Sequence, residues 1–362
     1  MGTIITRGIT GTRTRKFMSS ISLWKWFAGG LVGTAASFFV MATVKHGTEG
    51  EPRVQELLTA QQDTSKTLYG LNGLVKYGKV SLSNKKFIKA IDSTRIDFFR
   101  YPGGTNANYA NWRTDSPSLR SLQVFVQATG IKIMYDLNVV TSTLDDQLAM
   151  LDSANRMGIV GDGLFELGNE LNWFTYEGKE RFPNARAYAD TCHRWIAELK
   201  KRFPRAQFAV VGENKKWKGA EDWARDQLRR NPEVHLIWHF SPPGKFTHNG
   251  ILDTNALRKL IRDDFVNSFG KNISPSQVWI TEFNVGDHDK DPKELLDTLV
   301  PGQDVMAVKF ALQEFTDMGI KLIAKHNVIG KKYAAVYADY KTAYLLPAGI
   351  ALREFISTKR GG

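Results

Sequence analysis

The sequence has little of what several common function classes require. It contains one cysteine, Cys192, among 362 residues, so no intrachain disulfide can form, although this leaves a secretory route open. Cys192 lies within an apolar stripe at helical spacing, which favours a small buried hydrophobe over a catalytic thiol. Neither GxGxxG nor GxxxxGK(S/T) occurs, so the glycine-rich loops that bind nucleotide phosphates are missing. We therefore predict no cofactor.

The body of the chain also lacks a stripe of basic residues interleaved with aromatic ones, so we predict no nucleic-acid partner. The formal net charge is +12, but half of it belongs to the first 48 residues, which contain no acidic residue. The remaining mild positive charge fits either simple solubility or an anionic substrate. The six basic residues of the leader are Arg7, Arg13, Arg15, Lys16, Lys25 and Lys45.

Residues 26–44 form the one long stretch without any charged residue. Its length is close to the ~20 residues that span a bilayer as a helix, and the basic residues 1–25 before it predict a cytoplasmic N-terminus. We expect a transmembrane signal-anchor, with the catalytic domain extracytoplasmic and the membrane as a partner. A cleaved signal peptide, with small residues at Ala42 and Thr43, would make the protein secreted. The Arg-, Ser- and Thr-rich leader also resembles an organellar transit peptide. Residues 45–65 read as a linker.

From residue 66 the chain alternates short apolar runs with amphipathic helical patterns, which predicts an α/β fold. One helix is expected to begin at Thr143, whose hydroxyl can cap it, and to stop at Gly158. Eight strands separated by helices favour a (β/α)8 TIM barrel over residues 66–362, without a C-terminal β-sandwich. A doubly wound sheet is the alternative. The strand candidates are Thr67–Leu71, Ile96–Phe99, Ile131–Tyr135, Leu164–Leu167, Phe208–Val211, Val234–Trp238, Val278–Thr281 and Ile320–Ala324.

Polar residues follow these strand candidates, and two of them are glutamates, Glu170 and Glu282. In a (β/α)8 barrel the strand ends meet at one mouth, where the chemistry takes place. Two carboxyl groups can serve as the acid and the nucleophile or base of glycoside hydrolysis, and many donors and acceptors suit a sugar. The sequence therefore predicts an oligo- or polysaccharide substrate. The other candidate site residues are Asn72, Arg100, Asn138, Asn169, His239 and His326, with Trp173 as a ring that can stack on a sugar.

Two motifs resemble those of the clan A retaining glycoside hydrolases. The first is the pair formed by Asn169-Glu170 after the fourth strand and Glu282 after the seventh. The second is Arg100-Tyr101-Pro102-Gly103-Gly104, which resembles a strand-two motif of that clan. The stretch around Glu166-Leu167-Gly168-Asn169-Glu170 is most similar to the heparanase and β-glucuronidase branch, glycoside hydrolase family 79. The resemblance implies that Glu170 is the acid/base and Glu282 the nucleophile. It also implies that Asn169 contacts a sugar hydroxyl, that Arg100 orients Glu282, and that the substrate contains uronic acid.

The chain departs from this pattern at two places. We expect no C-terminal β-sandwich of the kind that many relatives carry, and His239 stands where relatives often carry a tyrosine. A membrane-tethered, non-catalytic carbohydrate-binding or scaffold protein is therefore the alternative function. Glu166 is expected to be a structural carboxylate paired with a neighbour. We predict no metal site, because His239 and His326 have no acidic ligand at close spacing, so we expect both to be hydrogen-bonding walls of the site.

Overall fold

The computed structural model describes residues 66–73, 80–115, 117–172, 176–214, 222–242, 246–285, 302–329, 334–339 and 341–361. The leader, hydrophobic segment and linker predicted for residues 1–65 lie outside these ranges. Among the helices that are described, none is long and apolar enough to cross a membrane.

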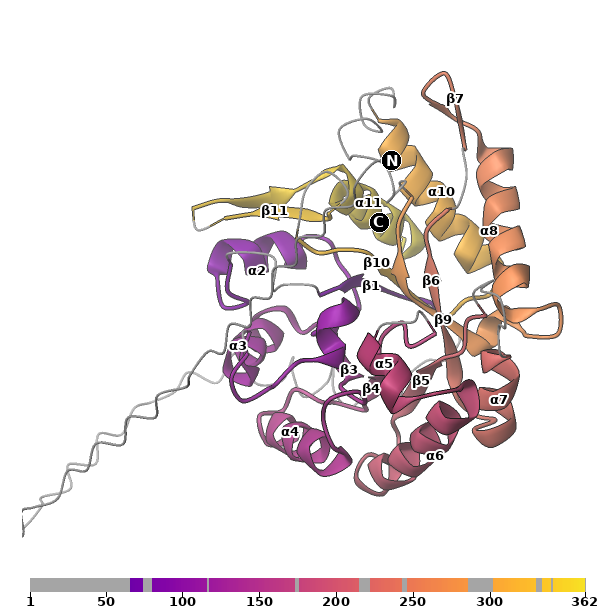
Figure 1. The fold of residues 1–362 in the computed structure, drawn as a ribbon. Helices are drawn as coiled ribbons and strands as arrows, with labels where there is room; N and C mark the ends of the chain where they lie inside the picture. Colours follow the sequence, from indigo (N-terminus) through magenta and orange to yellow (C-terminus); the bar gives the residue numbers. More distant parts are fainter. Residues whose placement is uncertain are drawn as a thin grey trace, which may run out of the picture. The chain divides into compact units, whose positions relative to one another are not determined.

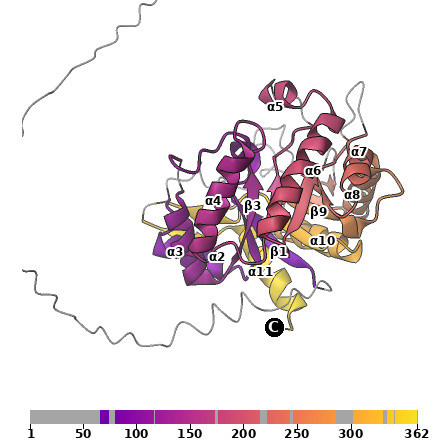
Figure 2. The same ribbon diagram turned by 90° about the horizontal axis from the view of Figure 1, so that it is seen from below.

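Eight parallel strands close into a barrel, as predicted, with β10 pairing back onto β1. Figure 1 shows the helices surrounding these strands, and Figure 2 shows the same ring from below. Each strand begins and ends within two residues of its predicted bounds. The barrel strands, in their order around the sheet, are β1 (Leu68–Asn72), β2 (Phe98–Tyr101), β3 (Lys132–Leu137), β4 (Leu164–Leu167), β5 (Gln207–Val211), β6 (His235–Phe240), β9 (Val278–Phe283) and β10 (Leu322–Lys325).

Helices fill the connections between the strands. The predicted cap of α4 is present, because the Thr143 side chain accepts a hydrogen bond from the Asp146 backbone N–H. The main helices are α2 (Lys85–Asp92), α3 (Leu119–Thr129), α4 (Leu144–Arg156), α6 (Ala185–Arg202), α7 (Trp223–Arg230), α8 (Thr254–Phe269), α10 (Gln303–Asp317) and α11 (Pro347–Lys359). Shorter elements are η2 (Gly104–Asn108), α5 (Tyr176–Arg181) and η3 (Pro275–Gln277). Two small hairpins were not predicted: β7 (Thr247–His248) with β8 (Ile251–Leu252), and β11 (Val336–Ala338) with β12 (Ala343–Leu345).

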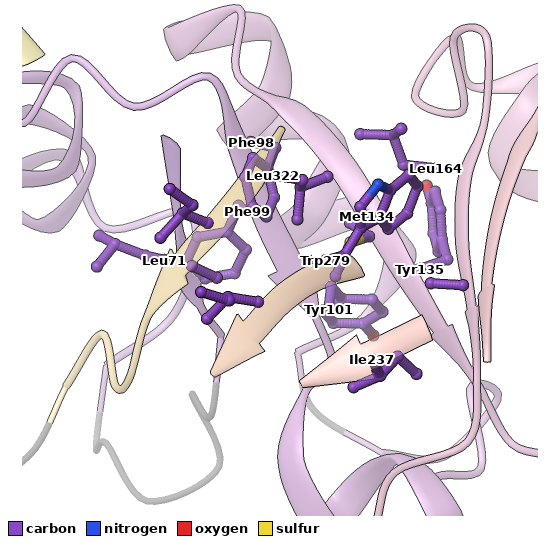
Figure 3. Packing of buried hydrophobic residues seen from close by; sticks show 14 of the residues in the cluster. Leu71, Phe98, Phe99, Tyr101, Met134, Tyr135, Leu164, Ile237, Trp279 and Leu322 are labelled. Carbon is purple, nitrogen blue, oxygen red and sulfur yellow. The ribbon is translucent and has the colours of Figure 1, made fainter. Parts of the chain in front are cut away.

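The barrel interior is packed with side chains below the mouth. A Cβ atom at Gly70 would lie 2.5 Å from the Phe98 ring, so glycine on β1 makes room for that ring. Figure 3 draws Phe98, Met134, Trp279 and Leu322 as members of one buried hydrophobic cluster. This apolar layer closes the lower barrel and leaves polar side chains to the strand ends above it.

Several predicted site residues lie inside the strands rather than after them. Asn72 is the last residue of β1, Arg100 is the third of β2, and His239 and Glu282 are within β6 and β9. Side chains that project from paired strands are held more firmly than side chains on loops. Because strand partners fix their backbones, these four residues form a rigid base for a site.

Candidate active site

Arg100 is the centre of a buried polar cluster that joins five strands, β1, β2, β3, β4 and β9. Its Nε and Nη2 donate to both oxygens of Glu166 at 2.7 and 2.5 Å, and Nη1 donates to Glu282 Oε1 at 2.6 Å. Nη1 also donates to Asn72 Oδ1 at 3.1 Å, and Nη2 to Asn169 Oδ1 at 2.8 Å. The predicted contact between Arg100 and Glu282 and the predicted pairing of Glu166 are therefore present. Nε, Nη1 and Nη2 of Arg100 all have acceptors among these residues, so the guanidinium serves to position the carboxyl and amide groups around it.

Glu282 is held from two sides. Besides Arg100, His326 Nδ1 lies 2.9 Å from Glu282 Oε2 and the same distance from Asn72 Nδ2. Burial by itself raises the pKa of Glu282, but the charges of His239 and His326, together with Arg100, outweigh it and hold that pKa well below its usual range. The Glu282 side chain keeps 14% of its surface exposed. It is therefore an ionised carboxylate that a ligand in the barrel mouth can reach.

Glu170 is held by a different partner. His239 Nδ1 lies 3.0 Å from Glu170 Oε1, and His239 Nε2 lies 2.9 Å from Thr281 Oγ1. Burial lowers the pKa of His239, but the charges of Glu282 and Glu170 and the bond to Glu170 raise it above its usual value. His239 and Glu282 are also register partners on β6 and β9. One imidazole thus lies beside both glutamates and brings them into a single site.

The backbone around Glu170 has an unusual conformation. Glu170 has φ = 50°, a region that non-glycine residues rarely occupy, and Gly168 has φ = 80°. Asn108 of η2 fixes the turn, since its side chain accepts from Asn169 N at 3.0 Å and donates to Asn169 O at 2.8 Å. Strained residues that are held in this way cluster at functional sites. The turn leaves the Glu170 side chain 31% exposed, so it is the more accessible of the two glutamates.

A β-bulge places two consecutive residues of β9 in the site. The β6–β9 register shifts between Trp238 and His239, so that His239 pairs with Glu282. Thr281 Oγ1 then reaches His239 and donates to Glu166 Oε1 at 3.3 Å, while the adjacent Glu282 contacts Arg100. Regular alternation would direct one of these two side chains away from the barrel. Thr281 was not among the site residues predicted from the sequence.

Asp136 of β3 joins the cluster, whereas Asn138, which follows that strand, does not. Its Oδ2 forms an ion pair with Arg100 Nη2 at 2.8 Å, without the geometry of a hydrogen bond. Burial raises the pKa of Asp136 well above its usual range; Arg100 opposes this shift, and the charges of Glu166 and Glu282 add to it. From the sequence, either Asp136 or Asn138 could be the polar residue at the end of the third strand, and the even spacing from Met134 is the signal that favours Asp136.

Asn138 has an internal role instead. Its Oδ1 accepts from the backbone N–H of Val140 and of Thr141, and its Nδ2 donates to Ala110 O and Thr141 Oγ1. These four bonds use both donors and both acceptor sites of the amide. The amide is thus fully used within its own loop, and a role of Asn138 in binding a substrate stays a prediction. Trp173, the predicted stacking ring, lies outside the described residues.

Solved structures similar to this chain share the barrel. An α-L-arabinofuranosidase from Thermotoga maritima is 17% identical, with a TM-score of 0.59 over 80% of this chain and 70% of that one. A family 51 α-L-arabinofuranosidase from Bifidobacterium longum is 15% identical, with a TM-score of 0.57 over 80% and 72%. No protein-family model and no curated protein sequence matches the chain. At these identities the similarity establishes the (β/α)8 fold, and the narrower resemblance to family 79 stays a hypothesis.

Proposed function

We propose that this protein is a retaining glycoside hydrolase, with Glu282 as the nucleophile and Glu170 as the acid/base. The observation that carries the proposal is the placement of both glutamates around His239, at the ends of β4 and β9 of one barrel. Retaining enzymes of this type need two carboxyl groups about 5–5.5 Å apart. We predict that separation for Glu170 and Glu282.

The environments of the two glutamates suit different roles. Glu282 has a lowered pKa and two hydrogen-bonding partners, so it is a carboxylate that can attack the anomeric carbon. Glu170 is more exposed and is bonded through Oε1 to His239, while its Oε2 accepts only a long hydrogen bond of 3.5 Å from Asn169 Nδ2, so Oε2 is the oxygen that would face a leaving group. A carboxylate oxygen of Glu282 bonds to the anomeric carbon while the glycosidic C–O bond breaks, and Glu170 gives its proton to the departing oxygen. Glu170 then removes a proton from water, which hydrolyses the glycosyl ester and frees Glu282.

Two glutamine variants test the assignment. Glu282→Gln should abolish turnover, because an amide cannot form the ester. Glu170→Gln should lose most activity on glycosides with poor leaving groups and much less on activated aryl glycosides, which need little protonation. Equal losses on both substrate types would contradict Glu170 as the acid. Glu314→Gln is the matched control, since Glu314 is buried in an ion pair with Arg258 and Arg262 away from the site.

The sugar is a separate part of the proposal. The mild basic charge of the body and the family 79 resemblance support a uronic-acid-containing glycan or β-glucuronide. Arg100 is already shared among three carboxyl groups, so a substrate carboxylate would meet backbone amides or a histidine instead. Aryl β-glucuronide, β-glucoside and α-L-arabinofuranoside form the first panel, the last because similar structures are arabinofuranosidases. Sugar binding without turnover of any of them would favour the non-catalytic alternative.

A further inference from the structure

One buried ionisable side chain near the site takes no part in the proposed mechanism. Lys325 is the last residue of β10 and is only 1% exposed. Burial lowers the pKa of its amine to about 7, because a charge is unfavourable in this environment. Its Nζ lies 5.8 Å from the centre of the Phe283 ring, and that ring packs against Phe315 of α10. The amine therefore lies behind the barrel wall, between the strands and α10, rather than in the mouth.

The amine of Lys325 joins the ends of two neighbouring strands. Its Nζ donates to Asn284 Oδ1 at 2.9 Å and to the backbone carbonyl of His326. Asn284 directly follows β9, and His326 directly follows β10. Even an uncharged amine has two N–H groups, so it can serve both acceptors in either protonation state. A methionine would fill similar space without burying a polar group, so these two hydrogen bonds are what the lysine adds.

The segments that the amine joins carry groups of the proposed active site. Asn284 lies two residues after Glu282, and His326 Nδ1 lies 2.9 Å from Glu282 Oε2. The backbone N–H of Asn284 also donates to Phe240 O at 2.9 Å, and Phe240 directly follows His239. The strands concerned, β6, β9 and β10, are neighbours in the barrel (Figure 1). One buried side chain thus connects the backbone that carries the nucleophile with the backbone that carries both imidazoles.

We propose that Lys325 is a positioning residue, which acts through His326 and Asn284 to hold the Glu282 carboxylate in its reactive orientation. Since the amine faces away from the mouth, it fixes its neighbours and does not contact a substrate. A displacement of about 1 Å in a reacting group can lower a rate on the order of 100-fold, so an anchor behind the site affects turnover. This role rests on the proposed function in that it takes Glu282 to be the nucleophile. The placement of the His326 imidazole by Lys325 does not depend on that function.

Turnover by the full chain gives the first test. Lys325→Met removes both donors and keeps the length of the side chain. We expect kcat on an activated aryl glycoside to fall about 10- to 100-fold with little change in KM, because the nucleophile is misplaced while the substrate contacts remain. Urea unfolding at the assay pH should show that this variant is folded. Asn284→Leu breaks the same connection from its other end. It should cause a similar loss, and the double variant should be no worse than the more affected single variant.

Nuclear magnetic resonance follows His326 without any turnover. In the full chain labelled with 15N at histidine, the His326 ring signals are assigned by their loss in His326→Gln. Lys325→Met and Asn284→Leu should both shift these signals, because the imidazole moves relative to Glu282. Lys309→Met is the matched control, since Lys309 is partly exposed on α10 and pairs with Glu354. It should leave both kcat and the His326 signals unchanged.

Three results would overturn the positioning role of Lys325. One is a set of His326 ring signals that is the same in Lys325→Met, Asn284→Leu and the unmodified chain. Another is a kcat for both variants within about twofold of the unmodified value. The third is a loss of activity that only matches the fraction of unfolded chain, because the amine would then act on stability alone. Misfolding of one variant leaves the other as a test. If the unmodified chain hydrolyses no glycoside, the hydrolase proposal fails, and the His326 signals still decide whether Lys325 positions the imidazole.

Discussion

Arg100→Lys tests whether one guanidinium organises the site. Arg100 makes five hydrogen bonds, three of them to the carboxylates of Glu166 and Glu282, and its side chain is fully buried. A lysine ammonium has three donors, so at least two bonds are lost. At about 1.5–3 kcal/mol for each bond to a charged group, the free energy of unfolding should fall by about 3–6 kcal/mol. That is a large part of the 5–15 kcal/mol typical of a domain.

The same substitution should alter the titration of Glu282. Arg100 is one of the charges that lower the Glu282 pKa, and lysine cannot hold its charge in the same place. The pKa of Glu282 should therefore rise, and the acidic limb of the kcat/KM profile should move to higher pH. Unfolding in urea gives the stability, and hydrolysis of an activated aryl glycoside across pH gives the limb.

Arg113→Lys is the control for the loss of a guanidinium. Arg113 is half-exposed, pairs with Asp146 and stacks over Trp112 at 4.3 Å. Surface pairs of this kind contribute at most about 1 kcal/mol. A loss below about 1 kcal/mol for Arg100→Lys, with an unchanged acidic limb, would refute the view that Arg100 organises the cluster.

Three further predictions concern other parts of the chain. Lys325 is buried, and burial lowers its pKa to about 7. Because its pKa in the unfolded chain is ~10.4, unfolding takes up a proton between these two pH values, and the buried charge destabilises the fold only at lower pH. Lys325→Met should therefore raise the free energy of unfolding in urea by on the order of 4 kcal/mol more at pH 6 than at pH 10. A pH-independent difference would show that the amine is charged in the folded state. An aryl β-glucuronide should have a higher kcat/KM than the matching β-glucoside, and the advantage should shrink between low and ~0.3 M salt, because attraction between charges is screened within ~10 Å at 0.1 M; preference for the glucoside at both salt concentrations would reject the anionic sugar. The full chain should stay in the membrane fraction after alkaline carbonate extraction, with its body protected from protease on the non-cytoplasmic side. Recovery as soluble protein would reject the anchor, and a mature N-terminus after Ala42 would indicate a signal peptide.

The sequence by itself determined the barrel and most of the residues that make up the candidate site. Buried parallel strands need short continuous apolar runs, and each run here stops at polar residues, so both the strands and their ends could be read directly. Glu170, Glu282 and Arg100 are identifiable because charged residues at such positions are costly unless they are paired or used. The contacts of His239 and His326 with the two glutamates also agree with their prediction as hydrogen-bonding walls.

Only the tertiary structure decided which neighbours at a strand end face the site. The β9 bulge directs both Thr281 and Glu282 inward, and a bulge depends on pairing with β6, which local sequence does not specify. Asp136 joins Arg100 while Asn138 is used up by its own loop, a choice set by strand register and by the Ala110 carbonyl. The clamp of Asn108 on the Asn169 backbone likewise joins segments that are distant in sequence. Such contacts arise from packing between elements, so they become visible only when the chain is folded.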